Sequence, residues 1–522
     1  MLKPLQLTGI LSLVSIFLFV GCGNEDDLPG PGPDPDPTIV LQQAVVESQS
    51  LTTNLSGTAP LTAVLAFSTS EPVSSRVRVL GKNGPLSDVI KDFSEASLLH
   101  GLPILGLYAD HNNEVEVTLF DATGNSLGTS SFNIQIGPLI SDLPSISIQT
   151  NEVQKEPGMT LVSYFGNNGS SSGQKPFMFD EFGDIRWYLN FSSNPVLANL
   201  FYDDGMERLQ NGNFYFGDRS TSRIYEVDII GRVINTWEMP GYTFHHEVFE
   251  KPNGNFLVTV NSQNSTVTVE DHIIEIDRNT GNIVNEWDLR ESLQRDRTAW
   301  TTDQSDWIHV NAVTYDENDD TIIISGRTQG VVKVTNDNEV VWILAPHRGW
   351  GTAGDGTDLT TKLLQPLDAG GQPITVANVL DGASNSGSFE WAWYQHAPQV
   401  MPNGNILLFD NGDNRNYQSG SYSRAVEYEI DATNMTIRQE WSYGKARGSE
   451  TYSRIVSDVD YHETSNHVFF SPGAIANNSI YGKVVEVDYT SNTVLFEASI
   501  IAPVAPFDIT FHRTERLSLY PD

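Results

Sequence analysis

Three stretches of the sequence place a histidine at the open end of an expected β-hairpin. In WYQHAPQVMPNGNILLFDNGD, Asn403-Gly404 is a turn signal between two apolar runs, and His396 stands before the first run. The stretches FHHEVFEKPNGNFLVTVNS and DWIHVNAVTYDENDDTIIISGRTQ have the same plan. Counting outward from each turn pairs His396 with Asn411, His246 with Asn261, and His309 with Arg327. Since all three histidines precede the first strand of an equivalent hairpin, we expect them on one face of the protein.

Three imidazoles and one guanidinium suit two kinds of chemistry. Histidines on neighbouring strands can bind a transition metal. However, Arg327 beside His309 would repel a dication, and no carboxylate occupies an equivalent place. The other possibility is a pocket for a sulfuryl or phosphoryl group, in which arginine donates two hydrogen bonds and histidine acts as donor, nucleophile or proton carrier. The pattern favours this anion pocket, with no metal and no cofactor.

The remaining histidines do not share the hairpin plan. His245 adjoins His246 and should point the opposite way in an extended strand. For His347, which lies near an insertion, a pocket-lining role and a packing role are both open. We expect the others outside the site: His100, His111, His272, His462, His467 and His512. One histidine at a hairpin mouth is more often a rim residue, but three at equivalent places favour a shared site.

The segment that carries these hairpins is a repeat. Strand-like runs that end in an aromatic residue recur at Trp187, Trp237, Trp287, Trp342, Trp441 and Phe496. The spacings are 50, 50, 55, 99 and 55 residues, and the long one is a single period with an insertion near 352–388. Six strand-rich repeats of about 50 residues predict a six-bladed β-propeller.

Residues before the repeat show period-two alternation, as in VRVLG and EVEVTLF, which is typical of a β-sandwich. We therefore predict an all-β protein with a small N-terminal β-sandwich at 38–145 and a six-bladed propeller catalytic domain at 146–522. The 42 glycines and 26 prolines fit such a turn-rich architecture. The formal charge of −36 makes nucleic acid an unfavourable partner, since phosphate binding requires a basic face.

The N-terminus has the pattern of an export signal. Residues 1–21 contain a basic residue and an apolar run that ends before Cys22, as in a lipoprotein-type signal peptide. Cys22 is the only cysteine, which favours lipidation over an ordinary secretory signal and excludes an internal disulfide. Residues 22–37 are acidic and rich in proline, like a tether. We expect an exported protein held by lipid at the cell envelope, at an outer membrane, facing the periplasm or the surface.

Several long motifs resemble those of the bacterial aryl-sulfate sulfotransferases. They include LHGLPILGLYADHNNEVEVTL, DWIHVNAVTYDENDDTIIISGRTQGVVKV, WILAPHRGW, WYQHAPQ and LFDNGDNRN, in this order along the chain. The resemblance implies an N-terminal sandwich followed by a six-bladed propeller. It also implies two-step transfer of a sulfuryl group from a phenolic sulfate ester to a phenolic acceptor, without a nucleotide sulfate donor.

The resemblance also implies roles for individual residues. His396 matches the nucleophile of a W-x-Q-H motif, and His309 and Asn311 match a W-x-H-x-N motif that contacts sulfate. Arg327 would hold the sulfuryl oxygens, and His246 or His309 would carry the proton. From the hairpin count, Asn411 is placed to hold one tautomer of His396. The chain departs from relatives that carry a cysteine pair, since it has Ser384, Ser386 and Ser388 in that region.

Three other functions stay open at this point. An arylsulfate hydrolase would use water as acceptor, and its site would lack an aromatic acceptor pocket such as Trp350, Trp391, Trp393, Tyr394 and Tyr417 would line. A metal-dependent polysaccharide lyase would require an ion. A non-catalytic, surface-binding propeller would not need the histidines. We expect contact with the membrane only through the lipid anchor, and pairing into a homodimer stays open.

Overall fold

The computed structural model describes residues 41–166, 174–201, 205–265, 267–297, 303–477, 479–503 and 509–521. These residues are mainly strands, with two short α-helices, α1 (Leu289–Ser292) and α2 (Ala377–Leu380). Within these ranges no helix has both the length and the apolar character that a membrane crossing requires. The expected signal peptide, Cys22 and the tether lie outside the described residues.

The N-terminal part is the expected sandwich. Its strands are β1 (Val46–Thr53), β2 (Ala63–Val79), β3 (Val89–Ile104), β4 (His111–Phe120) and β5 (Ser126–Ile136). The first half of β2 pairs with β1 and its second half pairs with β4, while β3 pairs with both halves. Alternate residues of β2 and β4 are buried, as the period-two pattern predicted, and Leu65, Val77 and Val117 lie in the core.

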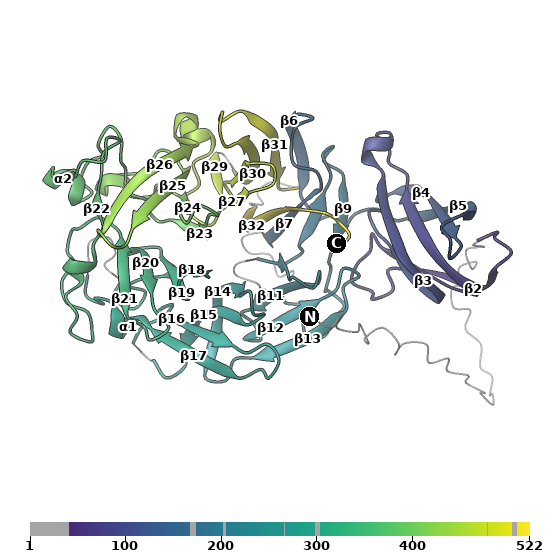
Figure 1. Ribbon diagram of the computed structural model, residues 1–522, viewed down its shortest axis with the longest axis horizontal. Helices are drawn as coiled ribbons and strands as arrows, with labels where there is room; N and C mark the ends of the chain where they lie inside the picture. Colours follow the sequence, from purple (N-terminus) through teal and green to yellow (C-terminus); the bar gives the residue numbers. More distant parts are fainter. Residues whose placement is uncertain are drawn as a thin grey trace. The chain divides into compact units, whose positions relative to one another are not determined.

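Six antiparallel sheets follow one another along the chain and form the blades of the predicted propeller (Figure 1). Two blades complete themselves with strands from distant parts of the sequence. The first is β32 (Thr510–Leu517), β7 (Met159–Gly166), β8 (Phe177–Phe179) and β9 (Ile185–Tyr188). The sixth is β27 (Asp458–His462), β28 (His467–Ser471), β30 (Ser479–Asp488), β31 (Val494–Ile501) and β6 (Ser145–Asn151), with β29 (Ile475–Asn477) paired to β30.

The other four blades are continuous in sequence. The second is β10 (Glu207–Arg208), β11 (Phe214–Asp218), β12 (Arg223–Val227) and β13 (Val233–Glu238). The third is β14 (Tyr242–Glu250), β15 (Phe256–Ser262), β16 (His272–Ile276) and β17 (Ile283–Asp288). The fourth is β18 (Val310–Asp316), β19 (Thr321–Gly326), β20 (Gly330–Val334) and β21 (Val340–Leu344). The fifth is β23 (His396–Val400), β24 (Ile406–Asp410), β25 (Arg424–Asp431) and β26 (Thr436–Tyr443), with β22 (Gln365–Pro366) parallel to β26.

The first strands of successive blades surround one axis. Residues of β10, β14, β18, β23, β27 and β32 together line a cavity of about 270 Å³. The β6 and β32 strands close the ring, because the N-terminal strand completes the last blade and the C-terminal strand opens the first. The insertion expected near 352–388 lies between β21 and β23 and contributes β22 and α2.

The aromatic residues that revealed the repeat lie on the last or outer strands of the blades. Three of the tryptophans make the same contact with the next blade. The indole N–H groups of Trp187, Trp237 and Trp287 donate to the carbonyl oxygens of Ile229, Arg278 and Thr335, at 2.7, 2.8 and 2.8 Å. Each acceptor lies in the turn between the third and fourth strands of the following blade. The repeated tryptophan therefore joins neighbouring blades.

Candidate active site

The hairpins at the mouth of the propeller bring four histidines together. The ring centroid of His246 lies 5.3 Å from that of His309 and 5.5 Å from that of His512. His396 is close enough to His309 and His512 for their charges to lower its pKa. His246, His512 and His396 belong to β14, β32 and β23, and His309 directly precedes β18, so the four come from the first strands of four blades or their starts. The expectation that His512 lies outside the site is therefore wrong.

Bulges in the first strands aim these side chains. The ladder is broken between Phe244 and Val248, between Val310 and Ala312, and between His396 and Gln399. His246 and His309 have φ angles of 60° and 52°, in the left-handed region that non-glycine residues rarely adopt. Bulges and strained backbone of this kind occur at rims and active sites because they redirect side chains.

The hairpin turns are as predicted, but two of the three expected cross-strand pairs are shifted. Gly254 and Gly404 occupy the Asn-Gly turns with φ angles of 87° and 83°. The amide of Arg327 donates to the carbonyl of His309 at 3.0 Å, which confirms that pair. In contrast, His396 pairs with Phe409, and Asn261 pairs with Thr243. The bulges supply the extra residues that symmetric counting from the turn omitted.

His396 has one defined tautomer. Its Nδ1 lies 2.7 Å from Asn411 Oδ1, and the Asn411 amide nitrogen donates to the carbonyls of Ser453 and Val456, both at 2.9 Å. Since those two bonds orient the amide, its oxygen must accept a proton from His396 Nδ1. The lone pair of His396 is then on Nε2. Burial and the charge of Arg327 lower the pKa of His396 well below its usual value, despite the bond to Asn411.

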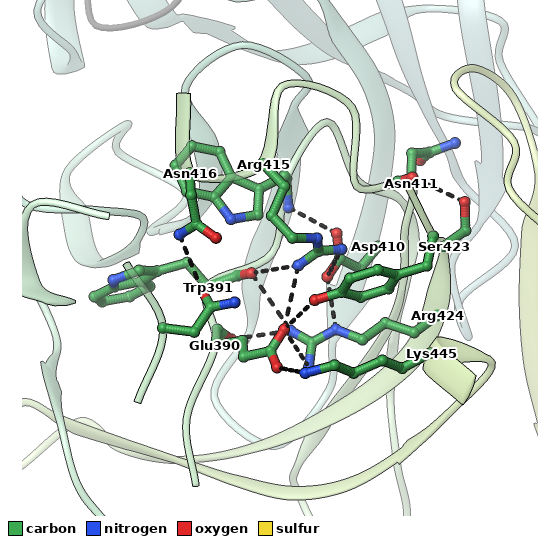
Figure 2. Close-up of polar contacts among 12 residues, drawn as sticks. Glu390, Trp391, Asp410, Asn411, Arg415, Asn416, Ser423, Arg424 and Lys445 are labelled. Carbon is green, nitrogen blue, oxygen red and sulfur yellow. Dashed lines mark hydrogen bonds and ion pairs between the residues drawn. The ribbon is translucent and has the colours of Figure 1, made fainter. Parts of the chain in front are cut away.

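A buried charged network surrounds the end of β24, next to Asn411 (Figure 2). The Asp410 carboxylate accepts bonds from Arg424 at 2.7 Å, from Arg415 at 2.8 Å and from the amide of Trp393 at 2.9 Å. Ser423 Oγ donates to the backbone carbonyl of Asn411 at 2.8 Å. These bonds fix the loops on both sides of His396, because Trp393 precedes it by three residues and Asp410 ends the partner strand.

His309 has the opposite electrostatic environment. Its Nδ1 lies 2.8 Å from Asp306 Oδ2 and 2.7 Å from Glu270 Oε2. Burial alone would lower the pKa of His309, but the hydrogen bonds to these two carboxylates outweigh it and raise the pKa to about 9. Glu270 is also held in place, since its backbone amide donates to Asn261 Oδ1 at 2.6 Å. His309 is therefore a cation at neutral pH, with Nε2–H directed toward His246 at 3.3 Å.

The His245-His246 pair does not alternate as an extended strand would. The two rings lie 4.0 Å apart, and His245 Nε2 reaches Glu270 Oε2 at 2.8 Å. The bulge at His246 turns both side chains toward the site, so the expectation that His245 points away is wrong. Burial and the charges of His245 and His309 hold the pKa of His246 well below its usual range. His246 is therefore a neutral hydrogen-bonding group.

Arg327 and Asn311 complete the expected set. The Arg327 guanidinium stacks on the ring of Tyr394 at 4.9 Å, and its Nε is buried without a hydrogen-bond partner. The Asn311 amide donates to the carbonyl of Gln395 at 2.9 Å, which ties the residue before His396 to the fourth blade. Asn311 Oδ1 has no partner. Both residues thus present polar atoms beside His396 that the protein itself does not satisfy.

Of the aromatic residues considered as acceptor lining, most pack inside blades. Trp350, Trp391 and Trp393 are buried, and Tyr417 donates to the carbonyl of Asp381 at 2.6 Å. Only Tyr394 lies against the site, through its stacking on Arg327. His347 has a packing role, with Nε2 at 2.9 Å from the carbonyl of Leu364.

Two carboxylates and one histidine were missed. The carboxylates of Glu270 and Asp306 reach His309 from the loops before β16 and β18. Neither belongs to a hairpin, so the hairpin count could not find them. His512 could have been found, since a propeller commonly closes with a C-terminal strand, and the strand-like stretch ITFHRTERL contains it. The structure also reveals a possible metal-ligand group in His245, His246, Glu270 and His309, whose ligand atoms lie within 4.8 Å of one another.

Comparison with protein families gives two matches along this chain. A model described as "Arylsulfotransferase (ASST)" matches residues 146–505, and one described as "Arylsulfotransferase Ig-like domain" matches residues 50–137. The first covers nearly all of the blade strands and ends before β32, and the second covers most of the sandwich.

Two curated proteins are similar along most of their length. Arylsulfate sulfotransferase AssT from Escherichia coli O6:H1 (strain CFT073) is 29% identical over 551 aligned positions, covering 85% of this chain and 89% of that protein. The protein of the same name from Lelliottia amnigena is 28% identical over 548 positions, with the same coverage. Among solved structures, virginiamycin B lyase from Staphylococcus aureus has a TM-score of 0.32 at 8% identity, covering 68% of this chain and 99% of that one.

Proposed function

This chain belongs to the arylsulfotransferase family, and we propose that it transfers a sulfuryl group from a phenolic sulfate ester to a phenol through a sulfo-histidine on His396. The observation that carries the proposal is the bond between His396 Nδ1 and Asn411 Oδ1, at 2.7 Å. Because this bond holds the proton on Nδ1, Nε2 keeps the lone pair that a nucleophile requires. The lowered pKa of His396 keeps the ring neutral at neutral pH.

The first half-reaction forms a nitrogen–sulfur bond. His396 Nε2 attacks sulfur in line with the bond to the phenolic oxygen, which breaks as the new bond forms. The electron pair leaves with the phenolic oxygen, which takes a proton from His309. Arg327, with its fork of donors, holds the sulfuryl oxygens, together with the amide N–H of Asn311 that does not bond to Gln395. The product is a sulfo-histidine, and the first phenol departs.

The second half-reaction reverses these steps with another phenol. The acceptor gives its proton to His309 while its oxygen attacks sulfur. The nitrogen–sulfur bond breaks, and its electron pair returns to His396 Nε2. His309 is the stronger candidate for the proton carrier because Asp306 and Glu270 maintain its charge, whereas His246 is held neutral. His246 then serves to orient the Nε2–H of His309.

The location of the enzyme is part of the proposal. The apolar run before Cys22, together with its being the only cysteine, supports an exported protein anchored by lipid to the cell envelope. The anchor would be the membrane contact, and the phenolic donor and acceptor would be small molecules that diffuse to the mouth of the propeller.

The decisive experiment is to trap the intermediate. Incubation with 4-nitrophenyl sulfate and no acceptor should leave one acid-labile sulfuryl group per chain, on the peptide that contains WYQHAPQ. Adding phenol should speed nitrophenol release and give parallel double-reciprocal plots, as expected when the first product leaves before the acceptor binds. His396→Ala should abolish both signals, and wild-type activity in that variant would refute the covalent route. Release at the same rate with and without phenol would instead favour the hydrolase.

A further inference from the structure

A group of metal-ligating side chains forms one wall of the candidate site. It consists of His245 and His246 in β14, Glu270 before β16, and His309 before β18, and we call it the His/Glu cluster. We infer that the His/Glu cluster binds a divalent transition-metal ion of the zinc type, and that the bound ion blocks sulfuryl transfer. The effect on transfer rests on the proposed function, whereas binding of the ion does not.

The spacing of the ligand atoms suits a four-coordinate ion. One nitrogen or oxygen of each side chain lies within 4.8 Å of the other three. His246 Nε2 and His309 Nε2 are 3.3 Å apart, and His245 Nε2 and Glu270 Oε2 are 2.8 Å apart. Ligands about 2.0–2.1 Å from a tetrahedral zinc ion lie about 3.3–3.4 Å from one another. The 3.3 Å pair already has the separation that a tetrahedral shell requires, and the 2.8 Å pair would open by about 0.5 Å.

One imidazole in the cluster lacks a partner that the protein would normally supply. His246 is 6% exposed, and its Nδ1 is buried without a hydrogen bond. Its other nitrogen faces only the ring of His309. Among the residues that the structure describes, neither ring nitrogen of this buried imidazole is bonded to a carbonyl, carboxylate or hydroxyl oxygen, so the ring has a lone pair available to an ion. A metal on His246 Nε2 would replace the imidazole–imidazole contact with a stronger interaction.

The donor set and the local charge select the kind of ion. Three imidazoles and one carboxylate favour zinc, cobalt, nickel or copper over magnesium and calcium, which prefer oxygen ligands. Two carboxylates, Glu270 and Asp306, contact His309 and offset the charge of a dication. Arg327 stacks on Tyr394, and its charge acts on His396.

Binding of the ion would remove the groups that transfer requires. His246 and His309 would each give a ring nitrogen to the metal, so His309 could no longer protonate the leaving phenol. The ion would also occupy part of the space beside His396. Zinc should therefore act as an inhibitor that a chelator removes, in contrast to the ion of a metal-dependent enzyme.

The test measures metal uptake and transfer separately on the full chain. After EDTA treatment and dialysis, the wild-type protein should take up one Co²⁺ or Zn²⁺ per chain, with the visible spectrum of four-coordinate cobalt. It should take up no Mg²⁺ or Ca²⁺. One equivalent of Zn²⁺ should abolish transfer, and EDTA should restore it. His245→Gln and His245→Asn should weaken Co²⁺ binding at least tenfold while transfer without metal continues, whereas His347→Gln, outside the cluster, should bind Co²⁺ like the wild type.

The possible results test the metal site and the proposed sulfuryl transfer separately. The inference would be overturned by a wild-type protein that binds no Co²⁺ or Zn²⁺, by folded His245 variants that bind the ion normally, or by EDTA abolishing transfer. Uptake by the wild type and not by the His245 variants, in a protein without any transfer activity, would support the metal site and refute the proposed function.

Discussion

At the scale of single residues, two histidines of the site are in opposite protonation states because they contact different side chains. His396 donates to a neutral amide, Asn411, and stays unprotonated. His309 contacts two carboxylates, Asp306 and Glu270, and stays protonated. Titratable groups whose environments separate their pKa values commonly divide the roles of base and acid. The proposed mechanism assigns these roles to His396 and His309, and the difference in their pKa values follows from one amide and two carboxylates.

Replacing the amide by a carboxylate should change the pH dependence of the nucleophile. In Asn411→Asp, an ionised carboxylate beside Nδ1 favours the imidazolium form and raises the pKa of His396. Less unprotonated His396 is then present at neutral pH, so the acid limb of the kcat/KM profile should move to higher pH. A pH–rate series with 4-nitrophenyl sulfate measures this limb. An unchanged acid limb in a folded Asn411→Asp protein would show that Asn411 does not control the pKa of His396.

Removing one of the two carboxylates that contact His309 should shift the alkaline limb of the kcat/KM profile. Because the hydrogen bond to Glu270 helps to raise the pKa of His309 to about 9, Glu270→Gln should lower that pKa. The alkaline limb of kcat/KM should shift down by about one pH unit, since the acid is lost at lower pH. The shift should be clearer with phenyl sulfate than with 4-nitrophenyl sulfate, whose leaving group needs less protonation. A limb that stays in place would exclude His309 as the acid.

The sequence was sufficient to place three histidines near one another, and it missed the groups that lie outside the hairpins. His396, His309 and His246 occupy equivalent places on repeated hairpins, and Arg327 stands opposite His309 on one of them. Glu270 and Asp306 reach the site from loops between blades, and no repeat pattern marks them. The geometry that brings them to His309 depends on how blades pack, which counting along one hairpin cannot reproduce.

At the scale of strands and hairpins, turns were predictable and pairing was not. The Asn-Gly turns appear where expected because glycine tolerates the positive φ that they need. The bulges between Phe244 and Val248 and between His396 and Gln399 shift the partners, since each leaves extra residues unpaired on one strand. These bulges include residues with strained backbone, such as Ala397 with φ 49°. Such conformations depend on the surrounding packing and leave little trace in local sequence.

The repeated tryptophan should stabilise the folded state through its indole N–H as well as through the volume that it fills. Trp287 is fully buried, and its N–H donates to Thr335 of the next blade at 2.8 Å. Trp287→Phe removes this donor, leaves the carbonyl without its partner, and should cost roughly 2–4 kcal/mol. Trp441→Phe is the comparison, because the Trp441 N–H is buried without a partner. It should cost less, about 1–2 kcal/mol. Urea unfolding of both variants measures the difference, and equal losses would exclude an inter-blade role for the N–H.

At the scale of the whole molecule, the proposed anchor would hold a strongly acidic enzyme at a membrane. A charge of −36 opposes electrostatic attraction to an anionic lipid surface, and lipid on Cys22 would be the means of attachment. Cys22→Ser should release the protein into a soluble exported fraction with transferase activity intact. Cell fractionation and fatty-acid labelling test this prediction. Membrane association that persists without the cysteine would contradict the lipoprotein assignment.

The cavity on the axis of the propeller is lined by more acidic than basic side chains. The cavity of about 270 Å³ is lined by five carboxylates, those of Glu207, Glu247, Asp458, Asp460 and Glu515. Arg513 pairs with three of them: it donates to Glu247, lies 3.1 Å from Asp458, and lies 3.4 Å from Glu207. Burial and mutual repulsion raise the pKa values of Asp460 and Glu515, the latter to about 8. Since these groups come from four different blades, the ring as a whole determines their protonation.

The raised pKa of Glu515 makes stability depend on pH in a defined direction. The folded protein keeps this carboxyl protonated up to about pH 8, whereas the unfolded chain ionises near 4.5. The folded state thus binds more protons between these values, so the contribution is complete below pH 4.5 and is lost as pH rises through 8. Glu515→Gln keeps a neutral side chain at every pH. It should match the wild type in urea midpoint at pH 5 and exceed it at pH 8, by the equivalent of about 2–4 kcal/mol. Glu47→Gln, at an exposed position in the sandwich, should show no such difference. A Glu515→Gln protein that is no more stable than the wild type at pH 8 would mean that the axial carboxylates are ionised in the folded enzyme.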